Sequence, residues 1–229
     1  MKKYIALLTA AFALIASAAF AVTPQEIADE VEIGKHVAAQ FAKEVRFTST
    51  PANVQKVFDK LVVGLERPLP YNVKVIKDSN PNAFCIPGGT IYITTGMIKF
   101  TRNENELAAV LSHELVHANR AHLVSQIERG QKVTMAALVA ELTGSRKGAA
   151  KLLRRVAKAT ANTSASYEME KEADTLSLQI LQRAGYSVNA PLSLMENIAS
   201  KFASASRRSG THPVIATRIA YIKTAIAQL

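Results

Sequence analysis

The sequence is poor in cysteine, in aromatic residues and in long apolar runs. It has one cysteine, Cys85, and no tryptophan among 229 residues. A single cysteine cannot form a disulfide within the chain, so the fold has to be stable without one. Only 6% of the residues are aromatic and no nucleic-acid-binding pattern is present, which disfavours DNA or RNA as a partner. The apolar fraction of 48% is still ample for the core of one medium-sized domain.

Acidic residues are also scarce relative to basic ones. The chain has 28 Lys and Arg against 18 Asp and Glu, a formal net charge of +10. Such a surface is compatible with peripheral contact with acidic membrane headgroups, although most of the charge is expected to form a solvated face. The basic segment Lys147–Lys158 is either a helix lying against a membrane or a solvated helix, and both alternatives stay open. The apolar run before it, Val133–Leu142, is too short to span a bilayer.

The N-terminus has the pattern of a secretory signal peptide. Met1-Lys2-Lys3 is the charged start, residues 4–16 are apolar, and Ala19-Phe20-Ala21 is a small-residue cleavage site. The apolar run is too short for an ordinary membrane span, although an uncleaved anchor is the alternative. No cysteine stands directly after the apolar run, so a lipid anchor at that point is not expected. We therefore expect cleavage after Ala21, with residues 22–229 forming one exported domain, periplasmic in a bacterium with an outer membrane.

One buried helix is predicted over Leu107–Gln126. Thr101 and Glu104 have the spacing of a capping box before it, and Gly130 follows as a stop signal. Apolar residues cover almost every side of this helix, so it should be buried. Two histidines and a glutamate inside it need partners, because unpaired polar groups are costly to bury.

His113 and His117 lie four residues apart in this helix, one turn above each other on the same face. They can direct two imidazoles at one metal ion, while Glu114 is rotated to one side, near a metal-bound water. This is the H-E-x-x-H arrangement of zinc hydrolases. A chance match is the alternative, and the buried helical setting argues against it.

A third ligand must come from another part of the chain, because catalytic zinc normally has three protein ligands and one water. The extended motif with a third histidine six residues further on is absent. Arg120 and Leu123 occupy the positions where that motif needs Gly and His.

A second helix, predicted over Tyr167–Ala184 and closed by a glycine, offers four carboxylates. At 100° per residue, Glu168 and Glu172 fall on its polar side, whereas Glu170 and Asp174 fall on the side facing the core. Glu170 is therefore predicted as the third metal ligand. Asp174, one turn later, is predicted to hold the outer N–H of a ligand imidazole. A structural salt bridge is the alternative role for both inward carboxylates.

The rest of the chain predicts an α+β, mostly α fold with a small sheet. A helix begins at Thr23-Pro24, with Ile33 and Val37 flanking its apolar stripe of Ile27, Val31, Ala38 and Phe41. A second amphipathic helix covers Asn53–Leu65. Three short segments then read as strands: Tyr71–Ile76, Asn82–Ile86 and Thr90–Thr94.

Four motifs together resemble metallopeptidase family forty-eight, which includes CAAX prenyl proteases, HtpX-like membrane proteases and BepA-like periplasmic proteases. In chain order they are Asn82-Ala83-Phe84-x-x-Pro87-Gly88-Gly89, His113-Glu114-x-x-His117, Glu170-x-x-x-Asp174, and Thr211-His212-Pro213 with Arg218. The chain looks like a minimal, exported, single-domain member. One departure is Arg120-Ala121-His122, where the family more often has Arg directly before His.

The three predicted strands make a small sheet beside the buried helix, and the resemblance implies that this is a zincin-like fold with one zinc ion. It implies a zinc endopeptidase over residues 22–229 that removes misfolded or misassembled envelope proteins, with Glu114 as the general base. The strand around Asn82, Ala83 and Phe84 would pair with an extended substrate, although a plain core strand is the alternative.

The resemblance also brings His212 and Arg218 to the active site as candidates for oxyanion stabilisation. His212 could instead occupy the open zinc position and hold the enzyme off, or be only a surface residue. Two other functions remain: a chaperone-like or regulatory module with a latent zinc site, and a structural zinc domain. A chaperone-like module would not need the base Glu114, which is intact. A structural zinc domain would leave the open coordination position unexplained.

Overall fold

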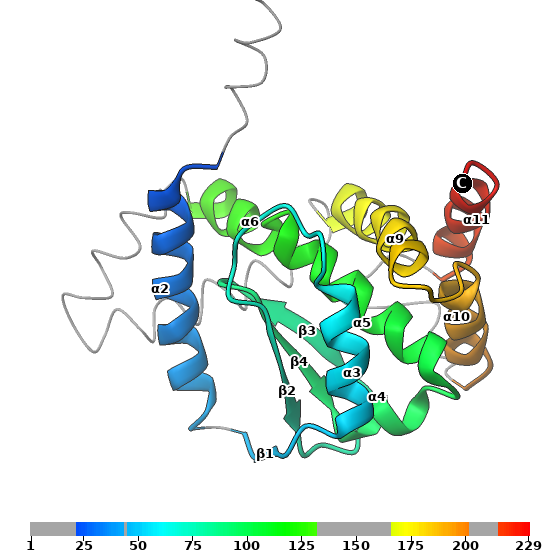
Figure 1. Ribbon diagram of the computed structural model, residues 1–229, viewed down its shortest axis with the longest axis horizontal. Helices are drawn as coiled ribbons and strands as arrows, with labels where there is room; N and C mark the ends of the chain where they lie inside the picture. The colour runs from blue at the N-terminus through cyan, green and yellow to red at the C-terminus, as the bar shows by residue number, and fades with distance from the viewer. Residues whose placement is uncertain (1–21, 44, 132–165, 202–214) are drawn as a thin grey trace, which may run out of the picture.

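The computed structural model describes residues 22–43, 45–131, 166–201 and 215–229. The predicted signal peptide, the apolar and basic segments after residue 131, and His212 lie outside these ranges. The described part is mostly helical with one small mixed sheet, which confirms the predicted fold class (Figure 1). None of its helices is both long and apolar enough to cross a membrane. The helices are α2 (Pro24–Phe41), α3 (Ala52–Leu61), α4 (Thr95–Phe100), α5 (Glu104–Asn119), α6 (His122–Gln131), α9 (Ser166–Arg183), α10 (Ala190–Lys201) and α11 (Ile215–Ile226).

The sheet has four strands in the order β1-β2-β4-β3, one more than predicted. The three predicted strands are present as β2 (Asn72–Ile76), β3 (Ala83–Ile86) and β4 (Thr90–Thr94). The additional strand, β1 (Phe47–Thr48), has two exposed residues and therefore carries no alternating pattern. β2 and β4 are parallel, whereas β3 runs antiparallel to β4 and forms one edge of the sheet.

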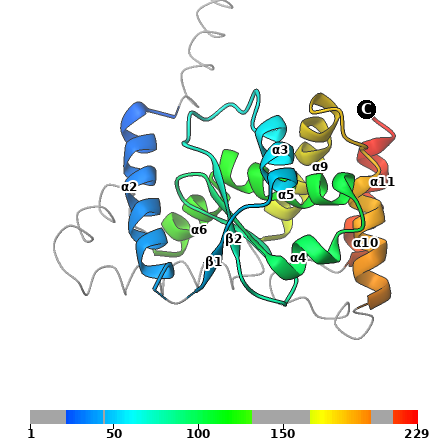
Figure 2. The same cartoon turned by 60° about the horizontal axis from the view of Figure 1, so that its bottom comes forward.

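Strand alternation divides the core between the two faces of the sheet. One face packs on α3 and α5 through Val73, Val75, Ile91 and Ile93. The other face packs on α2 and α6 through Ile76, Ile86 and Tyr92. The sheet thus separates α2 from α3 and the site helix α5 (Figure 2).

Helix α2 begins as predicted, but its buried face is not the predicted stripe. Thr23 forms the capping box, and the buried positions are Ile33 and Val37 together with Glu30 and Gly34. A Cβ on Gly34 would lie 2.1 Å from the carbonyl oxygen of Pro87, so only glycine lets the helix approach the β3–β4 turn this closely. Hydrophobic pattern analysis did not find this face because two of its residues, Glu30 and Gly34, are not apolar side chains.

The predicted single helix over 107–126 is wrong, because α5 ends at Asn119 and α6 begins at His122. Ala121 between them has a positive φ of 52°. The predicted capping box is also replaced, since Asn103 caps α5 and accepts the N–H of Glu106. Helix α5 is otherwise buried along almost its whole length, as predicted.

Candidate metal centre

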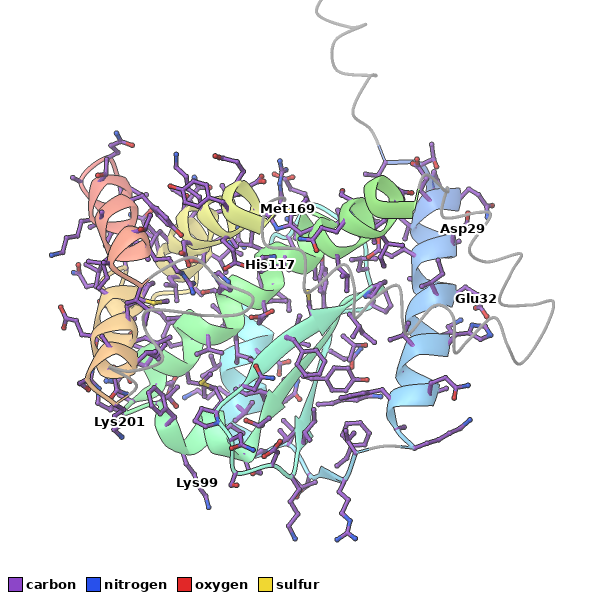
Figure 3. All side chains as sticks on the ribbon, turned by 180° about the vertical axis from the view of Figure 1, so that it is seen from behind. Asp29, Glu32, Lys99, His117, Met169 and Lys201 are labelled. Carbon is purple, nitrogen blue, oxygen red and sulfur yellow. The ribbon has the colours of Figure 1, made fainter. Side chains whose placement is uncertain are left out.

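The site lies where α5 and α9 pack along each other. Figure 1 shows α5 crossing the centre of the molecule with α9 beside it, and Figure 3 labels His117 on α5 and Met169 on α9. His113 and His117 come from α5, and Glu170 comes from α9. All three side chains are 13% exposed or less.

Three potential ligand atoms converge at this junction. The two imidazole Nε2 atoms of His113 and His117 are 3.1 Å apart. The Glu170 carboxylate oxygens lie 3.5 Å from Nε2 of His113 and 3.3 Å from Nε2 of His117. Ligand atoms around a tetrahedral zinc with bonds of about 2.0–2.1 Å are roughly 3.3 Å apart. The donor set and its spacing therefore fit a metal ion with one position left open.

Asp174 holds the other side of the His113 ring. Its Oδ1 lies 2.9 Å from Nδ1 of His113. The same carboxylate accepts hydrogen bonds from Nε and a terminal nitrogen of Arg218, at 2.8 and 2.7 Å, and from the Tyr221 hydroxyl at 2.7 Å. Burial would raise the pKa of Asp174, but Arg218 and His113 hold it well below its usual range. Asp174 is therefore ionised and fixed in place.

His117 has a different outer partner, which sequence analysis missed. Its Nδ1 lies 3.0 Å from Nδ1 of His122, and Nε2 of His122 lies 3.1 Å from a carboxylate oxygen of Glu172. Nε of Arg120 donates to the other Glu172 oxygen at 2.6 Å. The helical pattern predicts Glu172 on the polar side of α9, whereas the structure places it half-buried against His122. The available signal was the Arg120-Ala121-His122 sequence, which departs from the family pattern.

The electrostatics of the pocket favour one positive charge between the histidines and Glu170. Burial alone would lower the pKa of His113, but the carboxylates of Asp174 and Glu170 outweigh it and raise the pKa to about 10. Burial lowers the pKa of His117 to about 4, even though Glu170 opposes this shift. A metal cation can supply the charge that the carboxylates attract, in place of a proton.

The remaining predicted residues occupy different positions around this centre. Glu114 is buried directly after His113 on α5. Arg218 is also buried and binds Asp174. Of the predicted substrate strand, Asn82 lies just before β3, while Ala83 and Phe84 belong to it. The Phe84 ring packs against Phe41 and Tyr92, on the face of the sheet opposite α5.

Residues 48–226 match the sequence profile of Peptidase family M48. The chain belongs to this family of metallopeptidases. The resemblance predicted from its motifs is therefore confirmed, and the cluster of His113, His117 and Glu170 fits the family's zincin-like fold.

Several named relatives share this domain at moderate identity. The chain is 28% identical over 165 residues to a beta-barrel assembly-enhancing protease of Yersinia pestis, covering 66% of this chain and 33% of that protein. It is 29% identical over 158 residues to mitochondrial metalloendopeptidase OMA1 of Schizosaccharomyces pombe, covering 68% and 46%. It is 26% identical over 204 residues to metalloprotease YcaL of Escherichia coli, covering 86% and 76%. The match to the Yersinia protein thus spans about a third of that relative's length.

Proposed function

We propose that the protein is a zinc-dependent endopeptidase that hydrolyses misfolded or misassembled proteins of the cell envelope. The observation that supports this most is the convergence of His113, His117 and Glu170 on a point between α5 and α9. Two imidazoles and one carboxylate are the ligand set of catalytic zinc in several metallopeptidases. One zinc ion, when bound, supplies a Lewis acid that polarises a peptide carbonyl and lowers the pKa of water.

Glu114 is the residue we assign to proton transfer. It is buried directly after His113 and is not part of the proposed ligand set, so we assign its carboxylate the role of the base. It takes the proton from the attacking water and delivers it to the leaving amine. Arg218 donates two hydrogen bonds to Asp174, so we assign it the role of orienting His113 through that carboxylate. The resemblance implies an oxyanion role for Arg218 in addition. His212 keeps its two alternative roles, as oxyanion donor or as an occupant of the open zinc position.

β3 is the surface we assign to an extended substrate. Its one strand neighbour is β4, so its other side has no strand partner among the described residues. An extended peptide can add to such an edge through main-chain hydrogen bonds. Phe84 packs into the α2 face of the sheet, so this strand would bind substrate through its backbone rather than through that ring.

The envelope substrate is supported by two independent features. The N-terminal pattern predicts export to the periplasm, and relatives named beta-barrel assembly-enhancing protease share this domain. The excess of basic residues supports peripheral contact with acidic membrane surfaces.

A cleavage assay tests the peptidase function. Zinc-loaded protein comprising residues 22–229 is incubated with an unfolded outer-membrane β-barrel protein. Glu114→Gln should retain zinc, because the change is nearly isosteric, and should lose about 10²–10⁴-fold of the cleavage rate. Glu168→Gln, an exposed carboxylate on α9, is the matched control and should cleave like wild type. Full activity of Glu114→Gln would refute the assignment, and binding without cleavage by wild type would favour the chaperone-like alternative.

A further inference from the structure

His122 is a buried histidine outside the ligand cluster, and both of its ring nitrogens have partners. Its side chain is 5% exposed. Nδ1 lies 3.0 Å from Nδ1 of His117, and Nε2 lies 3.1 Å from Oε2 of Glu172. Glu172, His122 and His117 therefore form a continuous chain that ends at the atom facing Glu170.

The protons in this chain follow from its outer end. An ionised carboxylate can only accept hydrogen bonds, and Arg120 donates to the second oxygen of Glu172 at 2.6 Å. Nε2 of His122 must therefore carry the proton that Glu172 accepts. A neutral His122 then has a bare Nδ1, which accepts the Nδ1–H of His117. His117 is left with its lone pair on Nε2, the nitrogen that lies 3.3 Å from Glu170.

We propose that His122 is a positioning residue for metal binding, which holds His117 in the tautomer and ring orientation that presents Nε2 to the ion. This role rests on the metal centre proposed above. The two histidine ligands then differ in the outer group that orients them: a carboxylate orients His113, and a neutral imidazole orients His117. Outer partners of ligand histidines are typically worth about 10–100-fold in metal affinity or activity.

The break between α5 and α6 is what brings His122 to this position. On one continuous helix, a residue five places after His117 would sit about 140° around the axis and point away from it. Ala121 instead has a φ of 52°, a left-handed conformation that costs an alanine about 1–2 kcal/mol. Strain of this kind is typically kept where function requires the geometry. Here it turns the chain so that His122 faces back onto His117.

The wild-type protein provides the first test. Histidine side chains labelled with ¹⁵N in the zinc-free protein report by NMR which ring nitrogen carries the proton. The expected spectrum has the His117 proton on Nδ1 and the His122 proton on Nε2. A His117 proton found on Nε2 would overturn the proposal. This measurement needs no variant, so it decides the matter even where a substitution prevents folding.

Zinc affinity, measured by competition with a chelator, provides the second test. His122→Phe keeps the ring volume but removes both nitrogens, and it should bind zinc about 10–100-fold more weakly than wild type. His122→Asn places an acceptor near the Nδ1 position and should recover part of this loss.

Gln126→Ala is the matched control, because Gln126 also connects α6 to α9, through a hydrogen bond to the sulfur of Met169, and lies outside the chain of Glu172, His122 and His117. Unchanged affinity in His122→Phe, or an equal loss in Gln126→Ala, would overturn the proposal. Failure of the peptidase function would appear in the Glu114→Gln assay and would leave these affinities and tautomers unchanged.

Discussion

Oδ1 of Asp174 lies 2.9 Å from Nδ1 of His113, and the same carboxylate accepts hydrogen bonds from Arg218 and Tyr221 of α11. Helix α11 contributes no residue to the ligand cluster, yet it fixes one ligand ring through this single carboxylate. Glu172 and His122 do the same for His117 from the opposite direction. The outer contacts of the two imidazoles therefore connect the metal centre to α6, α9 and α11.

Loss of the Arg218 guanidinium should strongly destabilise the fold. Arg218→Leu leaves the Asp174 carboxylate buried without its countercharge, which typically costs about 3–5 kcal/mol. Tyr221→Phe removes one hydrogen bond to the same oxygen and should cost about 1 kcal/mol. Urea denaturation of the zinc-free protein at pH 7 measures both. Lys223→Ala, a change at an exposed residue of the same helix, should alter the free energy of unfolding by less than about 0.5 kcal/mol. A loss of stability in Lys223→Ala as large as that in Arg218→Leu would contradict the role of the ion pair.

Glu170 should be required for metal retention, and its exposed neighbour should not. Glu170→Ala removes one of the three proposed ligands, so zinc should be lost or held much more weakly after dialysis. Glu168→Ala, on the exposed side of the same helix, should retain one zinc per chain. Equal zinc content in the two variants would show that the third ligand lies elsewhere. Metal analysis by atomic absorption separates the two results.

Asp174→Ala should have an intermediate zinc content, because loss of an outer partner costs about 10–100-fold in metal affinity or activity.

The stability contributed by Glu106 should depend on pH. Burial would raise the pKa of Glu106, but hydrogen bonds from Arg102 and Ser193 outweigh it and hold the pKa below the ordinary value of 4.5. A carboxyl group whose pKa is lower in the folded than in the unfolded chain stabilises the fold at pH values above its unfolded-state pKa. This stabilisation is lost as the pH falls through the folded-state pKa.

Glu106→Gln should therefore cost about 1–3 kcal/mol at pH 7, and its difference from wild type should shrink as the pH falls below about 4.5. Chemical denaturation at pH 7, 5 and 3.5 follows this difference. Glu196→Gln, exposed on α10 near Ser193, should show little effect at any of these pH values. A cost of Glu106→Gln that is the same at every pH would contradict the charge-dependent contribution.

The two roles predicted for His212 have opposite consequences. If His212 donates to the oxyanion, His212→Ala lowers the turnover of an unfolded substrate. If its imidazole occupies the open zinc position until substrate displaces it, the same change raises turnover. We favour the second outcome, because a housekeeping protease benefits from low resting activity. An unchanged rate would make His212 an ordinary surface residue.

Pattern analysis predicted the elements whose burial follows a simple period, and it failed where single residues depart from it. The angular separation of side chains distinguished Glu170 from Glu168 on α9, and the structure places these two on the buried and exposed sides. The break at Ala121 was missed because alanine normally continues a helix, and the positive φ accompanies contacts of His122 with His117 on α5 and Glu172 on α9 that lie outside the local sequence pattern. Glu30 was missed as a core residue because its partners come from distant segments.

The components of the metal centre are far apart along the chain. His122 and Glu172 are separated by 50 positions, and Asp174 and Arg218 by a further 44. During synthesis, α5 therefore emerges from the ribosome well before α9, which carries Glu170, and α11 comes last. An incomplete chain has the H-E-x-x-H segment but not the third ligand or the anchored carboxylate. The order of synthesis alone thus delays any proteolytic activity until α9 and α11 have been made.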